Sequence, residues 1–95
     1  MSEDQVVEDV HDQLAATAEL PVDPSVSTYL GEAEAVAADA VAAQRAGQRD
    51  VVDRRVRQVE TLLSAVDETG HPGADEHVAA AKRAVSRYLE NRDSG

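Results

Sequence analysis

Apolar residues recur every three or four positions in four separate stretches of the chain. The clearest run consists of Val52, Val56, Val59, Leu63 and Val66. Steps of four and three residues place side chains on one face of a helix, in a seam like that of a coiled coil. No stretch alternates apolar and polar residues with the period of two that is typical of a strand. The pattern therefore predicts an all-α chain.

The seam belongs to a helix expected over residues 49–68, and three further stripes predict helices over 3–20, 24–46 and 74–91. The members of these stripes are Val7, Val10, Leu14 and Ala18; Val26, Leu30, Ala33, Ala37 and Ala40; and Val78, Ala81, Val85 and Tyr88. The sequence PVDP at 21–24 separates the first two stripes. Proline cannot continue a helix, whereas aspartate followed by proline is a common helix start.

Gly47 leaves two architectures open. A single glycine costs a helix only about 1 kcal/mol, so the second and third helices could fuse into one long helix in a dimeric bundle. The 11-residue spacing of Leu30, Val41, Val52 and Leu63 would suit such a helix. However, a rod of about 45 residues is too long to pack against 18-residue neighbours within one small domain. We therefore expect a break at 47–49 and an antiparallel four-helix bundle, with all 95 residues in a single helical domain.

The apolar residues are small, which limits the core. The chain has 17 Ala, 14 Val and 6 Leu, but no Ile, Phe or Trp. Because Ala and Val bury less surface than larger side chains, the hydrophobic contribution to folding is small. A chain of this length with so thin a core is marginally stable in ordinary buffer. This favours either a self-association surface or an unusual solvent.

The charge indicates what that solvent is. The chain carries 19 acidic residues against 9 basic ones, a net charge of −10, and Lys82 is its single lysine. Repulsion of this size is screened near 1 M salt, where the Debye length falls to about 3 Å. The composition resembles that of haloarchaeal proteins, which work in molar salt. An acidic mesophilic protein from a GC-rich genome is the alternative.

The stretch ETGHPGADEH at 68–77 holds two of the three histidines. His71, Asp75 and His77 could be read as a metal site. However, Asp75 and His77 are two positions apart on one expected helix, so they point to different sides. Gly70 and Pro72 are the residues that a helix end and a chain reversal require, and Asp75 suits the first turn of the next helix. We therefore expect a capped turn.

Glu8 and His11 have the E-x-x-H spacing that di-iron bundles use for ligands. Glu8 lies roughly 130° from the centre of its apolar stripe, so it is expected to face water. The second match, Glu68 and His71, straddles Gly70. The metal candidates of the chain are thus His71, Asp75, His77, Glu8 and His11. Capped or solvated side chains remain the favoured interpretation, and no cofactor is expected.

Charge is unevenly distributed along the sequence. Residues 1–44 contain ten acids and no Lys or Arg, whereas residues 45–95 contain nine bases and nine acids. Five arginines fall within thirteen residues, namely Arg45, Arg49, Arg54, Arg55 and Arg57. Several have an acid four positions away, and such pairs would make a solvated, ion-paired helix face. The functional alternative is an arginine patch that docks an acidic partner, either another chain or the acidic half of this one.

The stretch VETLLSAVDETGHPGADEHVAAAKRAV at 59–85 resembles the C-terminal part of small uncharacterised acidic helical proteins of haloarchaea. The resemblance implies a halophile and carries over no activity or site. The chain also lacks cysteine, a glycine-rich phosphate loop and a G-x-S-x-G motif, so no catalytic residue is predicted.

The sequence therefore favours a non-enzymatic protein-interaction or structural module of a halophile. The alternative is a metal-binding bundle or metalloenzyme that uses His11, His71 or His77. The expected partner is a protein, a second copy in a homodimer included, rather than nucleic acid or a membrane. The first residues of the chain are acidic and lack the basic region of a signal peptide, so the expected location is cytoplasmic.

Overall fold

The computed structural model describes residues 3–93, which form four α-helices joined by three short connections. The helices are α1 (Glu3–Thr17), α2 (Pro24–Arg45), α3 (Arg49–Ser64) and α4 (Pro72–Asp93). Within this range no residue belongs to a strand. The predicted all-α fold is confirmed.

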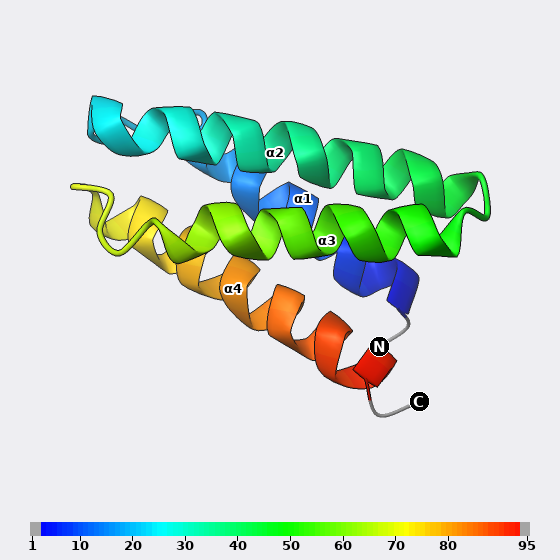
Figure 1. The fold of residues 1–95 in the computed structure, drawn as a ribbon. Coiled ribbons are helices and arrows are strands. Elements are labelled where there is room, and N and C mark those ends of the chain that lie inside the picture. Colours follow the sequence, from blue (N-terminus) through cyan, green and yellow to red (C-terminus); the bar gives the residue numbers. More distant parts are fainter. Residues whose placement is uncertain (1–2, 94–95) are drawn as a thin grey trace.

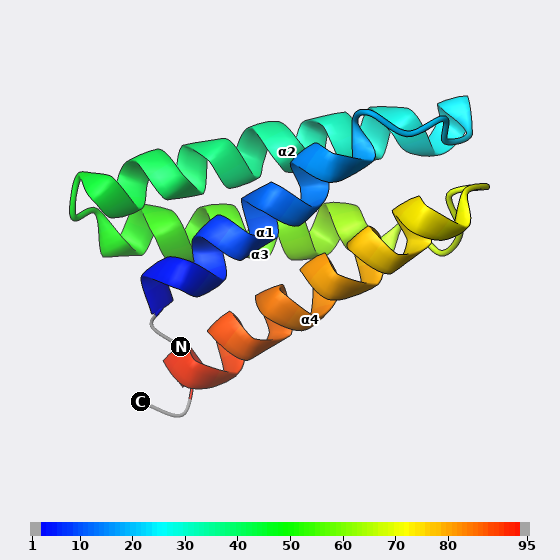
Figure 2. The same ribbon diagram turned by 180° about the vertical axis from the view of Figure 1, so that it is seen from behind.

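Consecutive helices run in opposite directions, as Figure 1 shows. α2 and α3 lie side by side as one antiparallel pair, and α1 and α4 form a second pair that crosses the first at an angle (Figures 1 and 2). α1 also contacts α2, and α3 also contacts α4, so each helix has two neighbours in the bundle. The body measures 37 × 22 × 20 Å. The four-helix bundle expected from the stripes is thus the observed architecture.

α2 ends just before Gly47, the residue at which the sequence allowed either a break or one long fused helix. Gly47 takes a φ of +75°, which costs a glycine little and other residues more. The N–H of Gly47 donates to the carbonyl of Gln44 at 3.1 Å, and that of Gln48 donates to Ala43 at 2.9 Å. This pair of bonds is a Schellman motif, which terminates a helix. The fused helix is therefore wrong, because the backbone reverses at Gly47 and α3 begins at Arg49.

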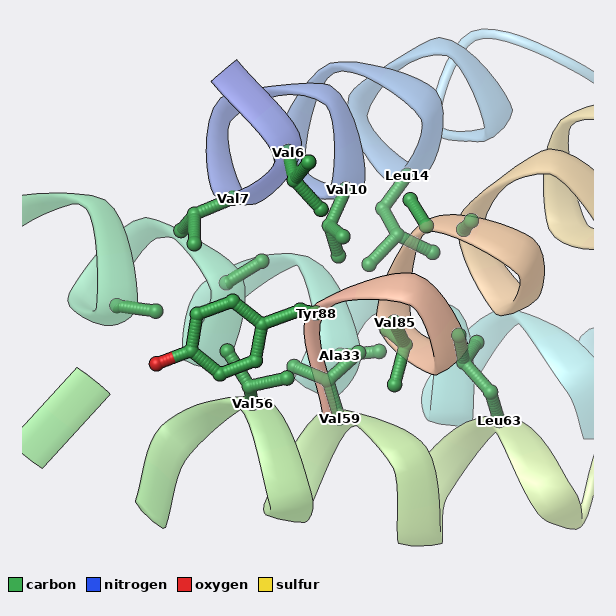
Figure 3. Close-up of a cluster of buried hydrophobic side chains, with 14 of the residues drawn as sticks. Val6, Val7, Val10, Leu14, Ala33, Val56, Val59, Leu63, Val85 and Tyr88 are labelled. Carbon is green, nitrogen blue, oxygen red and sulfur yellow. The ribbon is translucent and has the colours of Figure 1, made fainter. Parts of the chain in front are cut away.

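The predicted seam of α3 is buried along its whole length. Its members Val52, Val56, Val59 and Leu63 are at most 4% exposed, and Val66, just beyond the helix, is fully buried. Figure 3 shows Val56, Val59 and Leu63 of α3 pointing toward side chains of the other helices, with the Tyr88 ring among them. The core is built almost entirely from Val, Ala and Leu, as the composition required.

α1 is shorter than expected and ends at Thr17 instead of residue 20. Thr17 is buried, and its hydroxyl donates to the carbonyl of Leu14 at 2.6 Å. Ala18, which we placed on the apolar stripe of this helix, follows the last turn and is exposed. The stripe is completed by Val6 instead, which is 1% exposed.

The connections α1–α2 and α3–α4 meet at one end of the bundle. The N–H of Asp23 donates to the carbonyl of Thr69 at 2.8 Å, and the Asp23 carboxylate lies against Gly70. α3 stops at Ser64, four residues before the expected end, because the chain turns to bury Val66 and Thr69. The Lys82 ammonium donates to the carbonyl of Val66 at 2.6 Å, which satisfies one acceptor just beyond this helix end.

Candidate interaction surface

The turn at 69–75 is built as a helix start. The Nδ1 atom of His71 accepts hydrogen bonds from the N–H groups of Gly73 (3.0 Å) and Ala74 (3.2 Å), so the imidazole caps α4. Pro72 follows as the first helical residue, the position that proline favours. α4 consequently begins two residues before the expected residue 74. The Nδ1 atom of His71 is thus engaged with the backbone.

Asp75 belongs to the same turn. Its Oδ1 accepts from the N–H of Thr69 at 2.8 Å and from the Thr69 hydroxyl at 2.7 Å. The bond from the hydroxyl and then the bond from the backbone lower the pKa of Asp75, and the nearby His71 lowers it further. Thr69 is fully buried, so its polar atoms require these partners. The carboxylate therefore organises the connection between α3 and α4.

His77 faces a different helix. Its Nδ1 lies 2.8 Å from the Oε1 of Gln13, which joins α4 to α1 through one hydrogen bond. His71, Asp75 and His77 thus have separate partners. Within residues 3–93, no three His, Cys, Asp or Glu side chains are grouped closely enough to hold a metal ion.

Glu8 and His11 lie on α1 beside a hollow of about 290 Å³ between α1 and α2. Glu8 is exposed, as its angle from the apolar stripe predicts, and His11 is half-buried, with Nδ1 3.6 Å from the Oδ1 of Asp12. Ala38, Val41, Ala42 and Arg45 of α2 line the other side. The acidic half of the chain and one of the five arginines therefore meet across this hollow.

The five clustered arginines differ in their exposure. Arg45 and Arg49 lie on either side of the α2–α3 turn, whereas Arg54 and Arg57 are exposed along α3. Arg55 is half-buried and donates through Nη1 to the Oε1 of Gln58 at 2.8 Å. Four of the five arginines are therefore exposed to solvent, and Arg55 is the one that is half-buried.

An ion cluster that the sequence did not indicate joins α3 to α4. The Tyr88 hydroxyl donates to Oδ1 of Asp53. Arg92 places Nη2 3.2 Å from Oδ2 of the same carboxylate and Nε 3.1 Å from Oδ1. Burial raises the pKa of Asp53, but the hydrogen bonds from Tyr88 and Arg92 outweigh it and hold the pKa below its ordinary value. The charge of Arg57 acts in the same direction.

A groove of about 190 Å³ lies between α3 and α4. Leu63 and Val85 lie at its floor and are almost completely buried. Its polar lining comes from Glu60 and Ser64 on α3, and from Lys82 and Ser86 on α4. A shallow shelf on α4 continues from Lys82 and Ser86 to Arg83, Arg87 and Glu90. The groove and shelf together combine apolar surface with basic side chains.

Residues 6–95 match the family described as a domain of unknown function, DUF8152. The chain belongs to the DUF8152 family. The match spans all four helices, so it extends well beyond the stretch at 59–85. No curated protein and no solved structure matches the chain.

The bundle of this DUF8152 domain separates charge by side. α1 and α2 are neighbours and hold most of the first 44 residues, a stretch with ten acids and no Lys or Arg. α3 and α4 are also neighbours, and every Lys and Arg except Arg45 lies on them. We call these the acidic side and the α3/α4 side. None of the helices described over residues 3–93 has the length and apolar character needed to cross a membrane.

Proposed function

We propose that this protein is a non-enzymatic interaction module of a halophile, and that its α3/α4 side contacts an acidic protein surface. The observation that carries the proposal is the separation of charge. The two halves differ by ten charges, because residues 1–44 sum to −10 and residues 45–95 to zero. An acidic partner is repelled by the first half and meets exposed arginines, including Arg54 and Arg83, on the second.

High salt restricts how such a surface can work. Near 1 M salt the Debye length is about 3 Å, so charges attract a partner only when they are almost in contact. Arginine suits this requirement, because its planar guanidinium makes paired hydrogen bonds to a carboxylate. Exposed arginines of the α3/α4 side, including Arg54 and Arg83, are able to make such contacts.

Three features support the halophilic setting. The net charge of −10 on 95 residues requires screening, and the Val/Ala core leaves little stability to offset the repulsion. The resemblance of residues 59–85 to haloarchaeal proteins agrees with both. We therefore place the protein in the salt-rich interior of a halophilic cell.

Affinity capture from a native lysate in about 2 M KCl tests the proposal, because repulsion within the bait is screened there. The baits are the wild-type chain, an Arg54→Glu/Arg83→Glu variant, and a control with two reversals on the outer face of α2, Glu32→Arg/Asp39→Arg. All four positions are exposed. We expect the α3/α4 variant to lose the proteins that the wild type captures, and the control to keep them. Loss from the control alone, or the same proteins on all three baits, would contradict the proposal.

A further inference from the structure

The α2/α3 pair has an outer face that α1 and α4 do not cover. The bundle has two layers, with α2 and α3 in one and α1 and α4 in the other (Figures 1 and 2). The side of α2 toward α1 is marked by Val41 and Arg45, which line the hollow between those helices. At 100° per residue, Val36 and Asp39 lie about 140–160° around α2 from the middle of that pair. Both therefore belong to the outer face.

α3 contributes to the same face. Its side toward α4 is marked by Asp53, which binds a residue of α4, and by Glu60, which lines the groove between the two helices. Val51, Arg54 and Leu62 lie about 110–170° around α3 from the middle of that pair. These three residues therefore lie on the side of α3 that faces α2 and solvent.

Apolar side chains that are only partly covered run along the seam between α2 and α3 on this face. Val36, Val51 and Leu62 pack against the core but are only half-buried. Tyr29 lies two helical turns before Val36 and is 43% exposed, although its side chain is large. Covering this surface removes apolar area from water, which favours association.

The charge on this face changes sign from α2 to α3. α2 carries three acids and one arginine, a net charge of −2, whereas α3 carries four arginines and three acids, a net charge of +1. The exposed side chains of the outer face include Glu32 and Asp39 on α2 and Arg54 on α3. A partner of uniform charge would be repelled by one of the two helices. A surface with the same division of charge matches both.

We infer that the outer face of the α2/α3 pair is covered by the same face of a second copy of the chain. A two-fold axis along the seam lays α2 of each copy over α3 of the other. An axis across the seam would instead lay α2 over α2, where the charges repel. The change of sign therefore selects the first arrangement. The contact is isologous, so each of its interactions occurs twice.

Distance from the α2–α3 turn decides which residues meet. Asp39 lies six residues before the end of α2, and Arg54 lies five residues after the start of α3, about 9 Å and about 7.5 Å along the two helices. A two-fold axis along the seam preserves these distances, so Asp39 of each copy faces Arg54 of the other. Tyr29 and Leu62 lie about 24 Å and about 20 Å from the same helix ends, so they meet in the same way.

Sedimentation equilibrium of the purified full chain in about 2 M KCl tests the pairing, because repulsion between two chains of net charge −10 is screened there. We expect the wild type to form dimers as its concentration rises. Asp39→Arg sets arginine against arginine, and Arg54→Asp sets aspartate against aspartate. Each variant alone should raise the dimer dissociation constant by about tenfold or more. An equimolar mixture should restore dimers of one copy each, because every arginine then faces an aspartate.

Three further variants test the face itself. Tyr29→Ser removes apolar contact without changing charge and should also raise the dissociation constant by about tenfold or more. Glu8→Arg and Arg83→Asp make the matching charge changes on α1 and α4, and should leave the dissociation constant within about twofold of the wild type. Every substituted position is exposed, so the variants should fold, which circular dichroism verifies.

A wild type that stays monomeric at all concentrations overturns the second copy as partner. Folded variants whose mixture dimerises no better than either alone overturn the pairing of Asp39 with Arg54. Controls that weaken the dimer as much as the test variants overturn the choice of face. None of these results decides the proposed function, because the capture experiment reports binding to other proteins. Copies of the chain itself are left out when the captured proteins are compared.

Discussion

Three glycines show how much a single position can constrain the chain. Gly47 and Gly70 both take positive φ angles, +75° and +83°, whereas Gly31 lies inside α2. A Cβ at Gly70 would lie 2.8 Å from Oδ1 of Asp23, but at Gly47 and Gly31 it would meet nothing within 4 Å. A side chain would therefore meet backbone strain alone at Gly47, strain and steric overlap at Gly70, and neither at Gly31, where helix propensity decides.

Alanine at these sites should give three different results in urea denaturation. Gly31→Ala should stabilise the protein by up to about 1 kcal/mol, since alanine favours a helix. Gly47→Ala should destabilise it by about 1–2 kcal/mol through the strained φ alone. Gly70→Ala should cost at least as much, about 1–3 kcal/mol, because the Asp23 carboxylate must also move. A Gly70→Ala variant as stable as the wild type would show that the meeting of the two connections is not tight.

Asp53 should make the free energy of unfolding depend on pH. Its folded-state pKa lies below the ordinary value of 3.8, so its contribution is fully present above that value and is lost as pH falls through the folded pKa. Tyr88→Phe removes one of the bonds that lower the pKa. The variant should be about 0.5–1.5 kcal/mol less stable near pH 7 and should lose less stability between about pH 5 and 2.

The measurement is urea unfolding across that pH range in about 2 M KCl, where the fall in net charge with acid has little effect. If Tyr88→Phe and the wild type lose the same unfolding free energy on acidification, the Tyr88 hydroxyl does not lower the pKa of Asp53. The sequence placed Tyr88 in an apolar stripe and gave no indication of its contact with Asp53. Their contact joins residues 35 positions apart, and spacing within one helix cannot reveal it.

At the scale of the helices, the spacing of the apolar residues predicted which face of a helix is buried. Val52, Val56, Val59 and Leu63 are buried because a helix presents positions three and four apart on one face. The helix ends were less predictable where distant contacts decide them. α3 stops at Ser64, and the Val66 carbonyl beyond it is satisfied by Lys82, sixteen residues away. The cap of α4 is likewise an imidazole, His71, instead of the usual Ser, Thr, Asp or Asn.

A charge placed in the seam tests the assignment of this face. Val59 is 1% exposed, so Val59→Asp would bury a carboxylate without a partner and cost several kcal/mol, about 3 or more. Gln58→Asp is the matched control at an exposed neighbour, where the same charge should cost under about 1 kcal/mol. Circular dichroism and thermal melts compare the two. Equal melts would mean that Val59 does not face the core.

At the scale of the whole molecule, the balance lies between a small core and a large charge. The core side chains are nearly all Val, Ala and Leu, whereas the net charge is −10 over a body 37 Å long. A core with little apolar surface must therefore offset the repulsion among many like charges. Composition alone predicted this balance, but not that nearly all the basic residues would lie on one side of the bundle. That separation follows from which helices are neighbours, a long-range property.

Lowering KCl from about 2 M to about 0.1 M should unfold or expand the protein, because the repulsion is no longer screened. Helicity measured by circular dichroism should fall over this range. Glu32→Gln/Asp39→Asn removes two exposed acids and should keep its helicity to lower salt than the wild type. Constant helicity of the wild type across the range would refute the halophilic assignment.

The first turn of α1 and the last turn of α4 lie at the same end of the bundle, together with the α2–α3 turn (Figures 1 and 2). A short linker from Asp93 to Glu3 would therefore connect α4 to α1, and opening the chain at Gly47 would then give a circular permutant. In that permutant the arginine-bearing helices would leave the ribosome before the acidic ones, while every helix kept its two neighbours. The order in which the two halves are synthesised can thus be reversed without changing which helices pack together.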